Sequence, residues 1–219
     1  MKLYIVNAFV KDGKGGNPAG VMLNADDLSS DQKQQVAARI GYSETAFVSR
    51  SDRADFLLEF YTPNKQIPHC GHATIASFSL MNQLGMIKSD EVKMATIAGT
   101  NSVFRKNGMI LMEQQSPRYI EVKNSAAVLQ SLSLNKKDTI AEPLVVNTGN
   151  SFLLLEVQDG QTLAAIKTDE ASINEISAQY DLIGYYVFSR TNVSPADATT
   201  RMFAPYYAIS EEAATGMAG

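Results

Sequence analysis

The stretch Phe60–Gly85 reads FYTPNKQIPHCGHATIASFSLMNQLG and contains the only cysteine of the chain and both of its histidines. A strand-like end, a loop between two prolines and a Cys-Gly-His turn lead into residues 73–84, which are apolar nearly all round a helix. Such a pattern predicts a buried helix rather than a surface one. The apolar positions are Ala73, Ile75, Ala76, Phe78, Leu80, Met81 and Leu84. We therefore expect a buried helix that begins directly after a turn of reactive side chains.

The composition limits the classes of protein to which the chain can belong. A chain of 219 residues, 45% of them hydrophobic, can bury a sizeable core in one domain or two small ones. A net charge of −4 without a basic stripe argues against a nucleic-acid binder. No apolar run reaches transmembrane length, and Met1-Lys2 leads straight into a strand pattern rather than a signal peptide. A single cysteine excludes an internal disulfide and fits a reducing compartment, so we expect a cytoplasmic protein.

Strand patterns outnumber helix patterns in the rest of the chain. Helix patterns cover residues 31–40, 124–134 and 170–179, and strand patterns cover 3–10, 21–23, 42–49, 55–62, 92–98, 100–106, 109–113, 144–147, 152–157, 183–189 and 200–204. The two halves echo each other weakly, because Phe60–Pro63 followed by Cys70-Gly71 resembles Phe203–Pro205 followed by Thr215-Gly216. This echo predicts two mostly β lobes whose strands lead into a helix.

The glycine-rich loop at residues 13–18 follows the first strand and suggests dinucleotide binding. However, the third glycine of that fingerprint is missing, and the loop opens into a strand pattern rather than a helix. We therefore expect no nucleotide there.

The Cys-Gly-His turn suits a carboxylate ligand. A turn that enters a helix presents free backbone N–H groups and the positive end of the helix dipole. Gly71 lets a ligand approach the backbone closely. We expect a small acid to bind here.

Two side chains are candidates for moving a proton on such an acid. Glu44, just before an apolar strand, is either a partly buried general base or an exposed carboxylate at the end of a strand. His72 is either a proton or hydrogen-bond donor to substrate or a residue that only caps the helix.

Cys70 and the histidines leave further alternatives. Cys70 is either a thiolate activated by the helix N-terminus or a small buried hydrophobe, and a two-thiol racemase would need a second cysteine that the chain lacks. His69, Cys70 and His72 lie within four residues, too close in sequence to converge easily on one ion, so we expect no metal.

Five motifs together resemble the phenazine biosynthesis-like (PhzF) family, and they stand in that family's order along nearly the whole chain. They are Gly16–Val21, Ser43–Phe47, Phe60–Pro63, Cys70–Thr74, and Arg201–Pro205 with Ala214–Gly216. The resemblance implies a diaminopimelate epimerase-like α+β fold with two pseudo-symmetric lobes, residues 1–115 and 116–219. Each lobe would be a curved, barrel-like sheet around a central helix, with the active site between the lobes.

The resemblance also implies the function of an isomerase that needs no cofactor and is usually a homodimer. Matched by position, Glu44 is the catalytic acid/base, and His72 is the active-site histidine. Glu212 is the carboxylate of the second turn. The expected substrate-binding residues are Asn17, Gly71, Ala73, Thr215 and Gly216. Gly71 and Gly216 match the helix-start glycines that receive substrate.

The chain departs from the family pattern in the second turn. Where the family has Asp-Pro-Ala-Thr-Gly-Ser, residues 212–217 read Glu-Ala-Ala-Thr-Gly-Met, so Met217 replaces a hydroxyl. Relatives continue beyond this turn, so the second lobe is expected to be incomplete. These departures keep a second hypothesis open, a catalytically silent protein that binds small acids or a partner. A racemase or epimerase that uses Cys70 is a third hypothesis.

Overall fold

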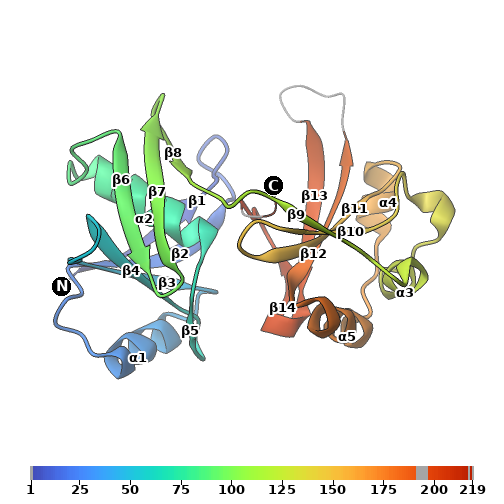
Figure 1. The fold of residues 1–219 in the computed structure, drawn as a ribbon, viewed down its shortest axis with the longest axis horizontal. Coiled ribbons are helices and arrows are strands. Elements are labelled where there is room, and N and C mark those ends of the chain that lie inside the picture. The colour runs from blue at the N-terminus through green and yellow to red at the C-terminus, as the bar shows by residue number, and fades with distance from the viewer. Residues whose placement is uncertain (1, 191–196, 217, 219) are drawn as a thin grey trace. The chain divides into compact units, whose positions relative to one another are not determined.

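The computed structural model describes residues 2–190, 197–216 and 218, and they form two compact units (Figure 1). Unit 1 contains residues up to 114 together with residues 214–216, and unit 2 contains residues from 115 to 213. Both combine sheets with helices, so the predicted α+β class is confirmed.

Unit 1 consists of one mixed sheet and two helices. Its elements are β1 (Lys2–Ala8), β2 (Asn17–Leu23), α1 (Ser30–Ile40), β3 (Thr45–Ser49), β4 (Phe56–Tyr61), β5 (Gln66–Ile67), α2 (Gly71–Gln83), β6 (Glu91–Thr96), β7 (Gly99–Lys106) and β8 (Met109–Met112). The strand order is β1-β2-β3-β4-β6-β7-β8, with β5 paired to β4. Helix α2 contacts β2 and β3 and also the strands at both ends of this order, β1 and β8. The sheet therefore curls around the helix.

Alternation along the strands gives this sheet two apolar faces. Ala46 and Val48 of β3 belong to the core cluster around α2, whereas Phe47 belongs to a second cluster beneath α1. In β4, Phe60 likewise belongs to the α2 cluster and Tyr61 to the α1 cluster. Successive side chains of a strand point to opposite faces, so a sheet covered on both sides needs apolar residues at both parities.

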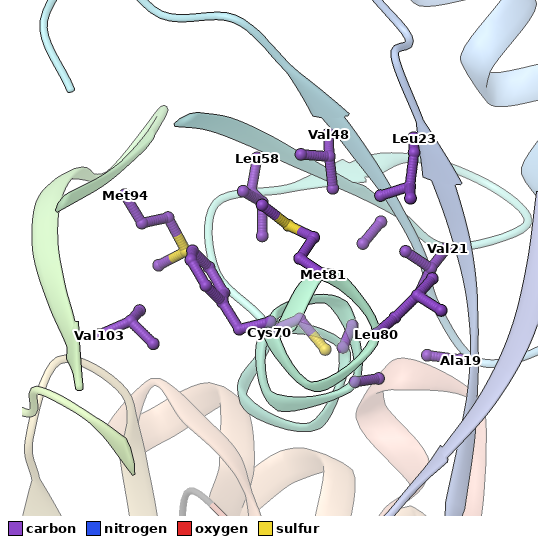
Figure 2. Close-up of a cluster of buried hydrophobic side chains, with 14 of the residues drawn as sticks. Ala19, Val21, Leu23, Val48, Leu58, Cys70, Leu80, Met81, Met94 and Val103 are labelled. Carbon is purple, nitrogen blue, oxygen red and sulfur yellow. The ribbon is translucent and has the colours of Figure 1, made fainter. Parts of the chain in front are cut away.

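Helix α2 is buried, as the sequence predicts. Most of its residues are closed to solvent, including Phe78 and Met81, which are fully buried. Figure 2 shows Val21, Leu23, Val48 and Leu58 on the strands around the helix. The helix begins two residues before the expected start, because Cys70 rather than His72 is the N-cap.

Helix α1 confirms its sequence signals and contributes a buried ion pair. Ser29 and Gln32 form a capping box, which a serine followed three residues later by glutamine signals in a sequence, and Gly41 ends the helix in the left-handed conformation. The nearly buried Lys33 of α1 forms an ion pair with Glu59 of β4. The surface helix is thus fixed to the sheet by both apolar and ionic contacts.

Unit 2 contains a six-stranded sheet and three helices. Its elements are β9 (Arg118–Glu121), α3 (Ser125–Ser131), a 3₁₀ turn (Lys136–Asp138), β10 (Leu144–Asn147), β11 (Ser151–Glu156), α4 (Gly160–Ala165), α5 (Glu170–Tyr180), β12 (Leu182–Arg190), β13 (Ala198–Ala204), a second 3₁₀ turn (Pro205–Tyr207) and β14 (Ile209–Glu212). The strand order is β14-β13-β12-β11-β10-β9, and only β11 and β12 pair in parallel. Side chains from the helices and the central strands form its core.

Three elements of unit 2 were not predicted. Strand β9 is exposed throughout, so no alternation of apolar and polar residues marks it. No helix pattern covers α4, whose N-terminus is capped by the side chain of Asp159. Strand β14 is a short edge strand with a register shift against β13. Short elements held by tertiary pairing leave little periodicity to read.

The second central helix is not among the elements of the described chain. Residues 213–216 form bends and a turn, and no helix begins at Thr215-Gly216 within the residues described. Among those same residues, no helix is both long enough and apolar enough to cross a membrane.

Candidate active site

The candidate site lies at the N-terminus of α2, and strand parity explains why Glu44 reaches it. Glu44 immediately precedes β3 and has the same parity as Ala46 and Val48, which face α2. Its main-chain carbonyl accepts a hydrogen bond from the N–H of Gly20 in the parallel strand β2. The carboxylate therefore points to the face of the sheet that α2 covers.

Three side chains of different chemistry meet there. Oε2 of Glu44 lies 3.4 Å from Nε2 of His72, and Nδ1 of His72 lies 3.5 Å from Sγ of Cys70. Glu44, Cys70 and His72 are 8%, 6% and 5% exposed, respectively. The exposed reading of Glu44 and the simple capping reading of His72 therefore do not describe this structure.

Burial sets the charge of the histidine. Removal from water disfavours the imidazolium and lowers the pKa of His72 from 6.5 to about 4. His72 is therefore neutral near pH 7, with one ring nitrogen that donates and one that accepts. A neutral ring can hydrogen-bond to substrate and to a carboxylate without adding a full charge to the site.

The three groups are ordered as a chain rather than as a cage for an ion. Their candidate ligand atoms lie within 4.8 Å of one another, so the turn brings together a ligand set that short-range spacing did not predict. However, Cys70 and Glu44 approach opposite nitrogens of the His72 ring. An ion bound to either ring nitrogen would lie beside only one of these two groups, which makes a chain of contacts the better description of the three side chains.

The other predicted residues of unit 1 lie in the first turn of α2 or on the face of the sheet that α2 covers. Asn17, 5% exposed, is the first residue of β2 and has the parity of Ala19 and Val21, which pack against α2. Gly71 opens the helix, and the side chain of the N-cap residue Cys70 makes no capping hydrogen bond. The side chain of Ala73 belongs to the hydrophobic core, so only its backbone N–H is suited to a ligand.

The predicted residues of the second turn lie elsewhere in the chain. Glu212 ends β14 in unit 2, and Thr215 and Gly216 follow in the turn that groups with unit 1. A Cβ on Gly216 would lie 2.2 Å from the ring of Phe9, so a side chain there requires the ring to move. Met217 is outside the described residues. Roles for Glu212, Thr215 and Gly216 in binding or proton transfer stay predictions.

The contact between Cys70 and His72 was not predicted from the sequence. The two side chains meet because one is the N-cap and the other lies in the first helical turn, and only the helix start places them. The parity of Glu44 along its strand was the available signal for the other contact.

Comparisons of the sequence and of the structure with known proteins point to the same family. The model of the phenazine biosynthesis-like protein family PhzC-PhzF matches residues 6–219. An uncharacterized isomerase from Clostridium acetobutylicum is 32% identical over 99% of this chain and 76% of its own length. The crystal structure of a PhzF-family phenazine biosynthesis protein from Bacillus anthracis superposes with a TM-score of 0.88 at 23% identity, covering 99% of this chain and 77% of that one. A hydroxyproline epimerase from Agrobacterium vitis shares the fold at a TM-score of 0.58 and 10% identity, covering 96% of this chain and 71% of that one.

Proposed function

Because the chain belongs to the phenazine biosynthesis-like PhzC-PhzF family, we propose that it is a cofactor-independent isomerase that moves a proton on a small carboxylic acid. Glu44 is the group that carries the proton. The curated relative with 32% identity is named an isomerase, which supports the class of reaction.

The observation that carries the proposal is the buried pair of Glu44 and His72 at the start of α2. A carboxylate 3.4 Å from a neutral imidazole, with both side chains under 10% exposed, is sheltered from competing water. General bases work from such positions within hydrogen-bond reach of the proton they take.

The proposed reaction has two steps. The substrate carboxylate binds the N–H groups at the start of α2, at Gly71 and its neighbours, with Asn17 beside it. The carboxylate of Glu44 takes a proton from a substrate carbon and becomes a carboxylic acid, and the C–H electron pair passes into the adjacent π system. Glu44 then returns the proton to a different carbon, so substrate and product have the same composition. Once Glu44 is protonated, a ring N–H of His72 can donate to the intermediate. Glu212, which was identified by motif, is a further candidate for proton transfer.

The test is exchange of solvent deuterium into small carboxylic acids. The protein is incubated with a panel of unsaturated and amino carboxylic acids in ²H₂O, and incorporation is followed by NMR. Glu44→Gln preserves the size of the side chain and should abolish incorporation, whereas Glu212→Gln should reduce it. Incorporation that is unchanged in Glu44→Gln would refute the proposal.

The same panel distinguishes the two other hypotheses. Met217 in place of a hydroxyl motivates the silent binding protein, which would show thermal stabilisation by an acid without any exchange. A racemase that uses Cys70 would lose exchange in Cys70→Ser, since a hydroxyl cannot replace a thiolate base. The proposed isomerase should retain exchange in that variant.

A further inference from the structure

Cys70 occupies a position that burial alone does not explain. It is the N-cap of α2 and belongs to the apolar cluster around that helix (Figure 2). Yet its Sγ lies 3.5 Å from Nδ1 of His72, within the range of a hydrogen bond to sulfur. A thiol is a weak donor and a thiolate is an acceptor, so the proton of this contact lies either on sulfur or on Nδ1.

The position of that proton determines the proton on the other side of the ring. Nε2 of His72 faces Oε2 of Glu44 at 3.4 Å. For a neutral imidazole and one negative charge over the three groups, two arrangements place a proton in each contact. In the first, the thiol donates to Nδ1 and the N–H of Nε2 faces the Glu44 carboxylate. In the second, Nδ1–H donates to a thiolate and Nε2 accepts from a protonated Glu44.

Two considerations favour the first arrangement, and the one effect that opposes them is small. In water a thiol is a weaker acid than a glutamic acid, with reference values of about 8.5 and about 4.3, so a single negative charge prefers Glu44. Cys70 lies among apolar side chains, which disfavours a thiolate. The helix N-terminus favours a thiolate, but a helix dipole typically contributes less than about one pKa unit.

We propose that Cys70 is a positioning residue: its S–H donates to Nδ1 of His72 and so holds the remaining ring proton on Nε2, facing Glu44. The role of this contact in turnover rests on the proposed isomerase function, but the hydrogen bond itself does not. With the ring fixed in this way, Glu44 is held as the charged base that must take the first proton. The only cysteine of the chain thus acts through His72 rather than on substrate.

The tautomer can be measured directly, because the chain has only two histidines. In ¹⁵N-labelled His69→Gln protein at pH 7, ring ¹⁵N shifts should show His72 with Nε2 protonated and Nδ1 bare. Cys70→Ser should keep this spectrum, since a hydroxyl also donates. Cys70→Ala should give a mixture of tautomers. A protonated Nδ1 before substitution, or an unchanged spectrum in Cys70→Ala, would overturn the inference.

A matched control separates this effect from a disturbed helix. Ser77 is a buried residue of α2 whose hydroxyl donates to the carbonyl of Ala73. Ser77→Ala should therefore lower stability without changing the His72 spectrum. If Ser77→Ala changes the tautomer as much as Cys70→Ala does, the effect belongs to the helix and the inference is wrong.

The thiol and the reaction rate supply two further readouts. The ultraviolet absorbance of a thiolate, identified by its loss in Cys70→Ser, should be absent at pH 7, and its presence there would contradict the inference.

Cys70→Ala should slow deuterium exchange roughly three- to tenfold, the worth of one hydrogen bond, with rescue by Cys70→Ser. If exchange is absent or independent of Glu44 while the spectra agree, only the proposed function fails. If exchange depends on Glu44 while the spectra disagree, only the role of Cys70 fails.

Discussion

Oε2 of Glu44 lies 3.4 Å from Nε2 of His72, and each residue is less than 10% exposed. The two come from segments separated by the whole of β3, β4 and β5, so the contact depends on how the sheet curls around α2. Burying a carboxylate beside a neutral ring costs folding free energy, and desolvated titratable groups of this kind are typical of functional sites. This relationship underlies the proposed chemistry.

The depressed pKa of His72 predicts a pH-dependent stability. Unfolded, its imidazole binds a proton below about 6.5, whereas folded it binds one only below about 4. Between these values the unfolded state binds more protons, so stability is full above pH 6.5 and falls as the pH drops towards 4. The complete shift corresponds to about 3 kcal/mol. Urea unfolding at pH 7, 6 and 5 should show most of this loss, and His72→Asn should flatten the curve.

His69 supplies the control for that experiment. Burial also lowers its pKa, so it contributes in the same direction. His69→Asn should remove a smaller part of the pH dependence than His72→Asn, because His69 is the less buried of the two. An equally steep curve in His72→Asn would show that the imidazole is not desolvated as described.

Removing only one partner of the ion pair between Lys33 and Glu59 should lower the stability of the protein strongly. Their side chains are 7% and 14% exposed. Lys33→Met leaves the Glu59 carboxylate nearly buried without its partner and should lower the unfolding free energy by about 3–5 kcal/mol. The double variant Lys33→Met/Glu59→Leu should recover most of that loss. A double variant as unstable as the single one would show that the pair itself stabilises unit 1.

Much of unit 1 could be predicted from residues that repeat a pattern. The all-round apolar stretch after Gly71 predicted a buried helix, and the Ser29–Gln32 capping box with Gly41 predicted α1. These signals are local, so they can be recognised in the sequence without knowledge of the fold. Strands β9 and β14 carry no such signal, because pairing with a neighbouring strand forms them rather than a pattern of their own.

Residues of the candidate site were identified from the sequence, but the contacts between them were not predicted. Glu44 and His72 were identified by motif, and the resemblance to the family assigned their roles. Their contact, and that of Cys70 with His72, requires the curl of the sheet and the start of α2, which no spacing in the sequence gives. The side chain of Ala73 packs in the core, so a contact of this residue with substrate would come from its backbone N–H and stays a prediction.

The packing of α2 should make its aromatic residue the most sensitive position of the core. Phe78 is fully buried and its ring lies edge-on to Phe56, with centroids 6.2 Å apart. Phe78→Ala should lower the unfolding free energy by about 3–5 kcal/mol through lost burial and a residual cavity. Phe104, which is 36% exposed on β7, is the control, and Phe104→Ala should cost considerably less. Equal losses in urea unfolding would mean that α2 is not the centre of this unit.

The central claim is that Glu44 carries a proton to and from a substrate carbon. The most direct measurement is the incorporation of solvent deuterium into a small carboxylic acid by the unmodified protein and by Glu44→Gln, with unfolding curves recorded for both. We predict incorporation by the former and a loss of at least about a hundredfold in the latter, the usual contribution of a general base, at equal or greater stability. Incorporation at the same rate by a folded Glu44→Gln protein would contradict the account.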